Sequence, residues 1–431
     1  MTKSLFESDC LRQLGRYQRI LVGFSGGLDS TVLLHGLAIQ PILAPKLIAV
    51  HINHGISPNA PAWQTHCQQV CQQLKIPLIT KLVEFERGAN LEEAARKARY
   101  KAFALLMEPG DCLLVAHHLD DQAETLLLQL FRGAGIDGLA AMASIKDFAE
   151  GKLLRPLIHQ SRQELEEYAR VWALKWIDDE SNEDIHFSRN YLRHRVIPLL
   201  QSRWPAVEVN LTRTASHCQQ AQANLDDLAR IDCPAIDKQS NRLALAPLGH
   251  LNHARMSNIL RLWLKINKIR LPGTSTFNRL ISEVIQASTD TNPLVYWDSH
   301  SVRRYQQTLY IIPYEQPPLP QTLLWSSFPN PLFLGKNLGY LNVTPLDKGL
   351  VIPAQSKIEV RFRQGGELFN WHGQTKQLKK LLQEWQVPSW LRDRIPLLYI
   401  NEHLASVIGY AVSDFFYQSD STNAVQINLY Y

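Results

Sequence analysis

Residues 25–30 read Ser-Gly-Gly-Leu-Asp-Ser, directly after an apolar run at 19–24 and directly before a helical pattern at 30–39. Glycine lets the backbone turn sharply and approach an anion closely. The following helix offers unpaired N–H groups and the positive end of its dipole, and Ser25 and Ser30 add hydroxyl donors. We predict a phosphate-binding loop, which is not a Walker A loop because Gly-Lys-Ser/Thr is absent. The alternative is a plain strand–turn–helix with a serine cap.

Strand and helix patterns alternate through the first half of the chain. Apolar runs typical of strands lie at 19–24, 46–53, 76–83 and 111–117, with helical patterns between and after them at 30–39, 62–74, 94–107 and 121–131. This order predicts βαβ units in an α/β fold, with a doubly wound parallel sheet. Ligands of such sheets bind beyond the carboxyl ends of the strands.

The rest of the chain predicts further domains. Helical patterns lie at 161–174, 190–201, 207–228, 253–265 and 276–287, and a hairpin pattern joins 294–296 to 301–312. We predict a catalytic domain at 1–205 and a mostly helical middle domain, with its connecting helix, at 206–312. A proline-rich linker at 313–333 and a small α+β C-terminal domain at 334–431 complete the prediction.

Composition indicates the cellular compartment and the charge of possible binding partners. A net charge of +5 is a mild basic bias, compatible with a polyanionic partner. Six cysteines without any C-x-x-C pair are typical of reduced cytosolic thiols, and they are Cys10, Cys67, Cys71, Cys112, Cys218 and Cys233. Neither a secretory signal nor a membrane-spanning stretch is recognisable, so we expect a cytoplasmic protein without membrane contact.

Two polar segments follow predicted strands, where a parallel sheet presents ligand groups. His51 and His54 end the second strand, and they are either ligand groups or an ordinary polar strand end. His117, Asp121 and Glu124 lie in Ala-His-His-Leu-Asp-Asp-Gln-Ala-Glu-Thr at 116–125. The two carboxylates share a helix face, which favours a pocket for Mg²⁺ or an ammonium group. The alternative is an acidic helix start stabilised by the dipole.

Basic residues recur on three predicted helices. Arg96 and Arg99 share one face of a helix for which Asn90 and Glu93 suit a capping box, and an ion pair of Arg96 with Glu92 is the ordinary interpretation. Phosphate binding is the alternative. Arg189 and Arg193 lie at i,i+4 on a basic face that either meets phosphates or is only solvated.

The segment 361–394 combines seven basic and three acidic residues with three tryptophans, which fits nucleic acid or a small tryptophan core. Within it, Lys376 and Lys380 have i,i+4 spacing and Lys379 lies beside them. One helix would therefore present all three lysines on one side. We predict that they contact a nucleic-acid backbone.

Together these segments resemble the bacterial tRNA(Ile)-lysidine synthetases, within the N-type ATP pyrophosphatase superfamily. The matching segments are SGGLDS, HINH, GANLEEAARKARY, AHHLDDQAET, RGAG with GL, RPL, DESN, RNYLRHRVIP, RFRQGG and KQLKK. The resemblance runs from about residue 20 to 395 and is weakest between about 230 and 330. Many family members carry Leu-Arg after the second histidine of HINH, whereas this chain has Gly55-Ile56-Ser57, so a role of that arginine does not transfer.

The resemblance implies a ligase that forms AMP. ATP would adenylate the C2 oxygen of the cytidine at the first anticodon position of tRNA(Ile), and the ε-amine of free L-lysine would then displace AMP to give lysidine. It implies a set of ATP-binding residues, which are Ser25, Gly26, Gly27, Leu28, Asp29, Ser30, His51, Arg96 and Arg99. The two arginines would contact either the phosphates of ATP or the tRNA backbone. It implies Mg²⁺ on Asp29, lysine binding or catalysis by His117, Asp121 and Glu124, and tRNA binding by Arg189, Arg193, Lys376, Lys379 and Lys380.

Three other functions compete with this one, and the oligomeric state, including a homodimer, stays open. A tRNA thiolase would be expected to need catalytic or cluster-binding cysteines, often in C-x-x-C. A GMP-synthetase-like amidotransferase would need an amide-hydrolysing partner, and no nucleophilic Cys-Gly signature is visible. A non-catalytic tRNA-binding module would leave the complete SGGLDS loop and the acidic segment unexplained.

Overall fold

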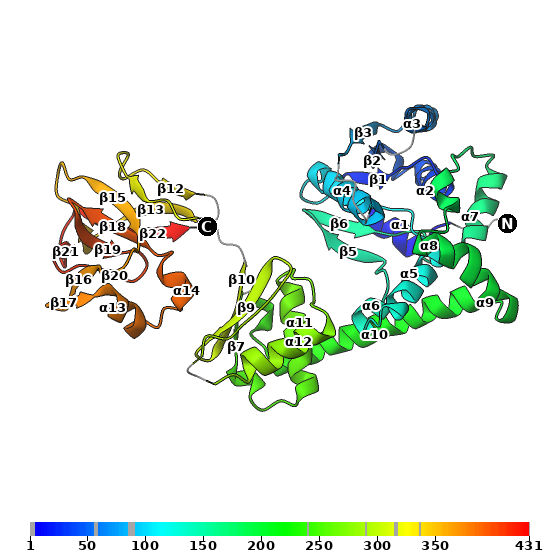
Figure 1. Ribbon diagram of the computed structural model, residues 1–431. Coiled ribbons are helices and arrows are strands. Elements are labelled where there is room, and N and C mark those ends of the chain that lie inside the picture. Colours follow the sequence, from blue (N-terminus) through cyan, green and yellow to red (C-terminus); the bar gives the residue numbers. More distant parts are fainter. Residues whose placement is uncertain are drawn as a thin grey trace. The chain divides into compact units, whose positions relative to one another are not determined.

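The computed structural model describes residues 5–55, 59–84, 91–238, 241–288, 291–313, 318–335 and 338–430. The chain divides into two compact units, Met1–Leu228 and Ala229–Tyr431, whose elements are labelled in Figure 1. Within the described ranges, no helix is long and apolar enough to cross a membrane. The boundaries of the four predicted domains stay a prediction.

The first unit is built on a six-stranded sheet in the order β3-β2-β1-β4-β6-β5. Neighbouring strands are parallel except for β5, which runs antiparallel to β6 at the edge. The strands are β1 (Ile20–Gly23), β2 (Leu47–Asn53), β3 (Leu78–Leu82), β4 (Cys112–Leu114), β5 (Ile145–Phe148) and β6 (Gly151–Leu154). The predicted parallel sheet is confirmed.

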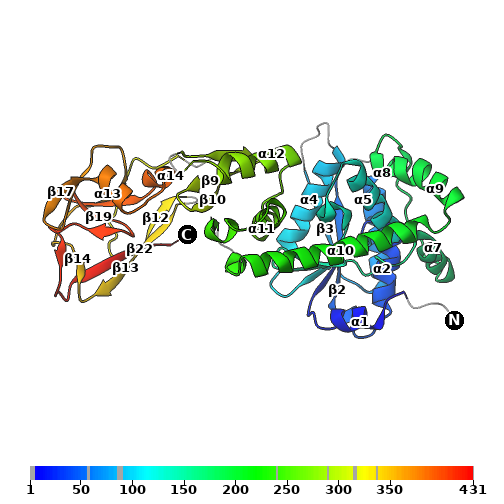
Figure 2. The same cartoon turned by 90° about the horizontal axis from the view of Figure 1, so that it is seen from below.

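Helices cover both faces of this sheet. They are α1 (Ser8–Leu14), α2 (Leu28–Ala38), α3 (Ala60–Leu74), α4 (Leu91–Leu106), α5 (Leu119–Phe131), α6 (Ile136–Leu139) and α7 (Arg162–Val171), with a 3₁₀ turn at Ala44–Lys46. Side chains of a strand alternate between its faces, so Ile20 and Val22 pack in one core with Leu33 of α2. Leu21 packs in the opposite core with Phe103 of α4, and Figure 2 shows α2 and α4 on either side of the strands. The sheet is doubly wound, as predicted.

The helical segment after α7 differs from the prediction of one helix at 190–201. It consists of a 3₁₀ turn at Glu180–Glu183, α8 (Ser188–Tyr191), a π-helical turn at Leu192–Val196 and α9 (Ile197–Arg203). The predicted connecting helix at 207–228 is α10 (Val207–Asp232). Its Gln219 side chain donates to the carbonyl of Ala140 at 2.8 Å, which ties α10 to the end of α6.

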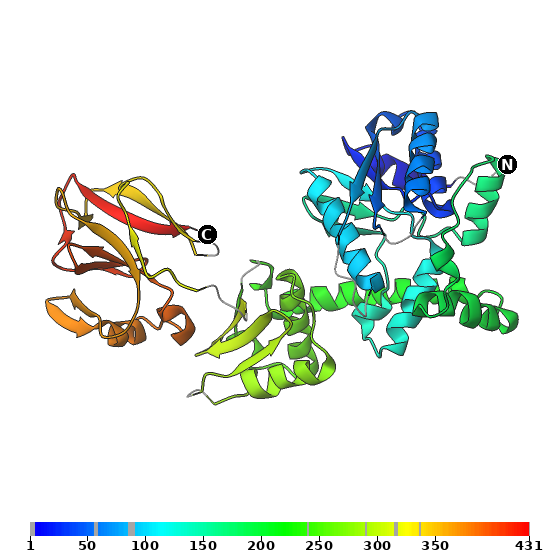
Figure 3. The same ribbon diagram turned by 45° about the horizontal axis from the view of Figure 1, so that its top comes forward.

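The first part of the second unit packs helices against an antiparallel sheet, ordered β7-β10-β9-β8, as Figure 3 shows. Its elements are β7 (Arg242–Ala244), α11 (His253–Ile266), α12 (Thr274–Arg279) with a π turn at Leu280–Ile285, β8 (Leu294–Trp297), β9 (His300–Tyr305) and β10 (Thr308–Pro313), besides 3₁₀ turns at Ile236–Lys238 and Ala246–Leu248. The predicted long strand at 301–312 is therefore wrong. The chain reverses at Gln306, where φ is 51°, so two strands replace one.

The last part of the second unit holds two five-stranded sheets, β11-β15-β18-β19-β20 and β12-β13-β22-β14-β21, and the hairpin β16-β17. The strands are β11 (Thr322–Leu324), β12 (Leu332–Gly335), β13 (Gly339–Leu346), β14 (Gly349–Val351), β15 (Ile358–Phe362), β16 (Leu368–Trp371), β17 (Gln374–Gln377), β18 (Pro396–Ile400), β19 (His403–Val407), β20 (Ala411–Val412), β21 (Tyr417–Gln418) and β22 (Ala424–Tyr430). The helices are α13 (Leu378–Glu384) and α14 (Ser389–Arg392). In Figure 3 the red strand β22 lies along the yellow strand β13, and this α+β composition agrees with the prediction.

The predicted linker at 313–333 contains more structure than its prolines suggest. Thr322–Leu324 forms β11 and pairs antiparallel with β15. Trp325 is 2% exposed, and its indole N–H donates to the carbonyl of Asn330 at 2.8 Å. Burial of an indole in a sheet core outweighs the low strand propensity of the surrounding prolines.

Candidate active site

The loop between β1 and α2 is held in shape by its own hydroxyl groups. The hydroxyls of Ser25 and Ser30 lie 3.1 Å apart, and the Ser25 hydroxyl also accepts the N–H of Gly27 at 3.3 Å. Ser30 and Thr31 both donate to the carbonyl of Gly27, at 3.0 and 2.9 Å. Gly26 has φ of +87°, a conformation that favours glycine. The loop is therefore organised before any ligand arrives.

A buried layer supports this loop from behind. His51 lies 3.0 Å through Nδ1 from the carbonyl of Phe24 and 3.4 Å from the Cys67 sulfur. A Cβ added at Gly26 would meet Cys67 and Ile177 at 3.0 Å each. Burial lowers the pKa of His51, so the ring is neutral and packs beneath the loop. His51 lies near the end of β2, as predicted. Its side chain is only 4% exposed, so it supports the loop from beneath.

Asp29 occupies the first turn of α2 and faces two cationic groups. Its Oδ1 lies 2.7 Å from Nη1 of Arg162 on α7, and its Oδ2 lies 3.8 Å from Nε2 of His118. Burial raises the pKa of Asp29, while His118 and Arg162 act in the opposite direction. No sequence pattern pointed to Arg162, since 133 residues separate it from Asp29.

The predicted acidic pair lies at the start of α5 and is buried. The Asp121 side chain is 11% exposed and that of Glu124 is 1% exposed. Arg193 donates to Glu124 Oε1 at 2.7 Å and to Asp121 Oδ1 at 3.3 Å. Arg189 lies 3.6 Å from each carboxylate and donates to Thr125 at 3.0 Å.

The predicted free basic face of Arg189 and Arg193 is therefore wrong. Both side chains turn inward, with 25% and 33% exposure. The physical reason is that buried carboxylates are stable only when they are paired and hydrogen-bonded. A role for these arginines in tRNA binding stays a prediction.

Two adjacent histidines take opposite charge states. Burial, partly offset by Asp121, lowers the pKa of His117 to about 3. Burial acts the same way on His118, but Asp121, Asp120 and Asp29 outweigh it and raise its pKa to about 9. Of the two histidines in this segment, His117 was the predicted site residue and His118 was not. The sequence shows Asp120 and Asp121 next to His118, but Asp29 belongs to α2 and reaches the histidine only through the fold.

Phosphate binding by Arg96 and Arg99 stays a prediction. Arg96 and Arg99 lie on α4, and the Arg96 guanidinium is 5.0 Å from the Tyr100 ring centre. The Asn90 cap and the side chain of Glu92 lie outside the described part of the chain. His54 packs near Arg99, and burial followed by Arg99 and His51 lowers its pKa to about 4.

The prediction that one helix carries Lys376, Lys379 and Lys380 is wrong. Lys376 belongs to β17, where it pairs with Phe369, and its Nζ lies 3.2 Å from Glu384. Helix α13 begins two residues later, at Leu378. Lys379 and Lys380 are exposed on that helix. Two of the three lysines are therefore helical, as predicted.

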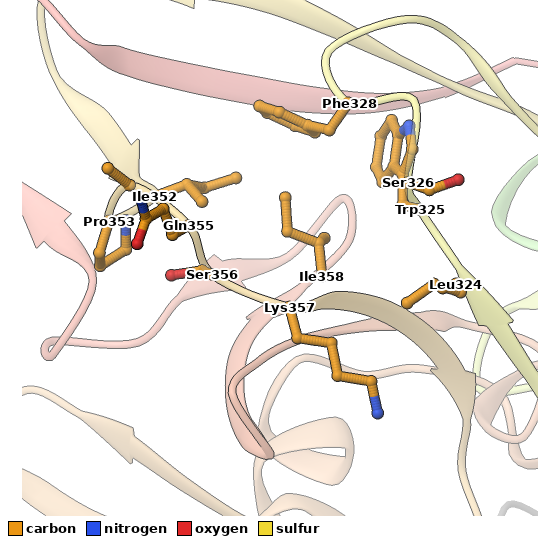
Figure 4. A pocket seen from close by; sticks show the side chains of 11 residues that line it. Leu324, Trp325, Ser326, Phe328, Ile352, Pro353, Gln355, Ser356, Lys357 and Ile358 are labelled. Atoms are coloured by element: carbon orange, nitrogen blue, oxygen red, sulfur yellow. The ribbon is translucent and has the colours of Figure 1, made fainter.

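A pocket of about 380 Å³ lies in the second unit, between β11 and the segment that leads into β15, as Figure 4 shows. Trp325 and Phe328 form one wall. Lys357 is its charged lining residue, and Nζ of that lysine lies 2.5 Å from Glu359. This pocket belongs to a different unit from the loop and the acidic pair, and its cation already has a partner.

Three family models match the chain, a PP-loop domain at 3–200, a TilS substrate binding domain at 243–310 and a TilS substrate C-terminal domain at 358–429. The tRNA(Ile)-lysidine synthase of Legionella pneumophila (strain Paris) is 53% identical over 427 residues, covering 99% of each chain. The chain belongs to the tRNA(Ile)-lysidine synthase family. The synthase of Coxiella burnetii (strain RSA 493 / Nine Mile phase I) is 40% identical over 92% of this chain and 89% of that relative.

Solved structures are more distant. The U34-tRNA thiolase NcsA from Methanococcus maripaludis is 20% identical, with a TM-score of 0.40, over 49% of this chain and 80% of that one. A TILS C-terminal domain is 23% identical, with a TM-score of 0.20, over 24% of this chain and 92% of that one. Membership of the lysidine synthase family, resting on the full-length relatives, removes the thiolase, amidotransferase and non-catalytic alternatives.

Replacing Gly26 by alanine tests the loop. We expect Gly26→Ala to raise the Kd for ATP at least about tenfold, because an L side chain at positive φ costs about 1–2 kcal/mol and its Cβ would press on Cys67 and Ile177. Gly27→Ala is the matched control, since Gly27 has φ of −73° and its added Cβ meets only ordinary contacts. Calorimetric ATP titration measures both. Equal affinities of the two variants would contradict the importance of the Gly26 conformation.

Proposed function

We propose a division of labour among the residues of this site. The chain catalyses ATP-dependent formation of lysidine on tRNA(Ile), the activity for which relatives matching 99% of its length are named. The observation that supports the proposal is the preorganised loop at the carboxyl end of β1, whose hydroxyl groups and backbone hold one another in place. We assign to Ser25–Ser30 the phosphates of ATP, which adenylates C2–O of the cytidine at the first anticodon position.

Asp29 is our candidate ligand for Mg²⁺. Mg²⁺ in nucleotide sites commonly takes one or two carboxylates and completes its shell with substrate phosphates and water. Asp29 beside the loop fits that pattern, and among the described residues no group of three His, Cys, Asp or Glu side chains forms a separate metal cage. The ion, when bound, would neutralise charge on the departing pyrophosphate. Arg162 holds the Asp29 carboxylate in place at 2.7 Å.

The acidic pair is our candidate site for the attacking lysine. Within the described residues, Oε2 of Glu124 is buried without a hydrogen-bond partner, and its distance to Arg189 Nε is 3.6 Å. A buried carboxylate oxygen in this state favours an additional donor, such as an ammonium group. The incoming ammonium competes with Arg189 and Arg193 for the carboxylates, which lowers the net gain of binding.

Glu124 also has the properties of the general base. The ε-amine attacks only when it is neutral, so a nearby group must take its proton. Burial raises the pKa of Glu124, opposed by Arg193 and reinforced by Asp121. A carboxylate with a raised pKa accepts a proton more readily than an exposed one. We therefore assign ammonium binding to Asp121 and Glu124 together, and proton removal to Glu124.

Product analysis tests the overall reaction. Mass spectrometry of nucleosides from tRNA(Ile) incubated with the chain, ATP and L-lysine should find lysidine, with AMP and pyrophosphate as co-products. Omission of either tRNA or lysine should stop turnover, because we expect the adenylated base to form on RNA and to be resolved by the amine. Detection of ADP and phosphate in place of AMP would overturn the proposal.

Charge removal from the acidic pair tests the lysine site. Asp121→Asn and Glu124→Gln should raise the KM for lysine by about ten- to hundredfold, because charge-assisted hydrogen bonds contribute about 1.5–3 kcal/mol. The KM for ATP should change much less, and Glu124→Gln should also lower kcat. Asp137→Asn on the neighbouring helix α6 is the control for loss of one carboxylate. Equal changes in both KM values would instead assign the pair to the metal.

The lysines of the second unit are our candidate contacts for the tRNA backbone. The double variant Lys379→Ala/Lys380→Ala should weaken tRNA binding and flatten its salt dependence by about one unit of slope per lost phosphate contact. Lys376→Ala should have the smaller effect, because Glu384 already pairs with this lysine. Filter binding at several salt concentrations measures both. Unchanged affinity and slope in the double variant would leave these lysines as solvated residues.

We extend the proposal to the cytoplasm, where ATP, lysine and tRNA occur together. The cysteines agree with that location, because disulfides are rare in cytosolic proteins. Burial also raises the pKa of Cys67 and of Cys112 to about 12. Thiols that stay protonated are poor nucleophiles, and all six cysteines are free.

A further inference from the structure

Three cations gather around the ring of Tyr100, at one side of the site described above. The Arg96 guanidinium lies 5.0 Å from the ring centre and the Lys146 ammonium 5.9 Å from it. Arg155 lies close enough to the Tyr100 side chain to interact with it electrostatically. The three residues come from α4, from β5 and from the position after β6, elements that lie side by side in Figure 1. We call Arg96, Lys146 and Arg155 the Tyr100 cation cluster.

Within the described side chains, no carboxylate pairs with any member of this cluster. Arg155 is 5% exposed, yet it donates to neutral acceptors, Nδ1 of His117 at 3.2 Å and the carbonyl of Ala143 at 2.5 Å. Burial and then the other two cations lower the pKa of Lys146. By contrast, Lys152 in the same hairpin is paired with Asp147. The cluster thus holds positive charges against their mutual repulsion, which a bound anion would relieve.

The cluster is rigid enough to select a ligand. Tyr100 packs edge-on against Phe103 at 6.2 Å and against Phe148 at 5.7 Å, measured between ring centres. These contacts fix the ring between α4 and β5, and the ring in turn orients the cations. Groups held in place before binding lose little entropy when a ligand arrives.

The place of the cluster in the sheet favours one anion. Arg155 follows β6, and the sheet order sets β4 between β6 and the loop-bearing strand β1. With strands about 4.8 Å apart, β6 lies about 10 Å and β5 about 14 Å from the strand that carries the ATP loop, on the side away from β2. It also adjoins His117, and through it the acidic pair. An anion here is next to the reacting centre but is set apart from phosphates bound by the loop.

We infer that Arg96, Lys146 and Arg155 form a binding site for a backbone phosphate of the RNA, next to the cytidine that is modified. The inference rests on the proposed function only for the identity of the RNA. For Arg96, the resemblance left open whether the bound phosphate belongs to ATP or to the RNA, and we assign it to the RNA. Arg155 and Lys146, to which no role had been given, become RNA-binding residues. Contacts of this kind position the substrate and carry no base identity.

Lys146 is the residue to change first, because it is exposed on the edge strand β5 and its replacement leaves the core unchanged. We expect Lys146→Ala to weaken tRNA(Ile) binding about tenfold at ~0.1 M salt and to reduce the salt slope by about one unit. Lys146→Glu should weaken it further. Lys152→Ala is the matched control, since that lysine is one hairpin position away and already paired. The Kd for ATP should be unchanged in all three variants.

Two results would overturn the inference. A raised Kd for ATP with unchanged tRNA binding would assign the cluster to an ATP phosphate, and unchanged binding of both ligands would leave it without a ligand. Arg155→Lys provides the second variant, which keeps the charge and loses the forked donor geometry. It should weaken RNA binding with little change in the salt slope. Lysidine formation by the wild-type chain is measured on the same RNA, so failure of the proposed function is seen separately from failure of this site.

Discussion

The contact on which the site depends is the ion-pair network between Asp121 and Glu124 of α5 and Arg189 and Arg193 of the segment after α7. Two carboxylates this deeply buried would be unstable without counter-charges. The network therefore does two things at once. It joins the segment of α8 and α9 to the sheet domain, and it gives the buried Asp121 and Glu124 side chains cationic partners.

The neighbouring groups follow from that network by electrostatics. His118 stays protonated because three aspartates surround it, and the protonated ring in turn stabilises Asp29 and Asp121 as anions. His117 stays neutral and accepts a hydrogen bond from Arg155. Positive charge thus gathers on the side of β6, and the buried carboxylates lie at the start of α5.

Structural features that lie within one short segment of the chain could be predicted from the sequence. The loop Ser25–Ser30 needs only a strand, two glycines and a helix start, all of which are adjacent in the chain. The sheet followed from alternating periodicities, and the acidic pair from its spacing. What escaped prediction depends on distant partners. Arg162 meets Asp29 from across the fold, and the inward turn of Arg189 and Arg193 depends on a carboxylate pair about 70 residues earlier. Lys376 was misassigned because helical spacing has no meaning once the residue enters a hairpin.

The wide turn at Leu192–Val196 gives the network an unusual sensitivity to chain length. A π-helical turn holds one residue more than an α-helical turn, and such turns are frequent at functional sites. An α-helix advances by about 100° per residue, so shortening this turn by one residue would rotate α9 by about that angle relative to α8. Arg189 would keep its place while Arg193 swung away from Glu124. A single-codon deletion within this turn would therefore rearrange the acidic pocket although Asp121, Glu124, Arg189 and Arg193 all remained in the sequence.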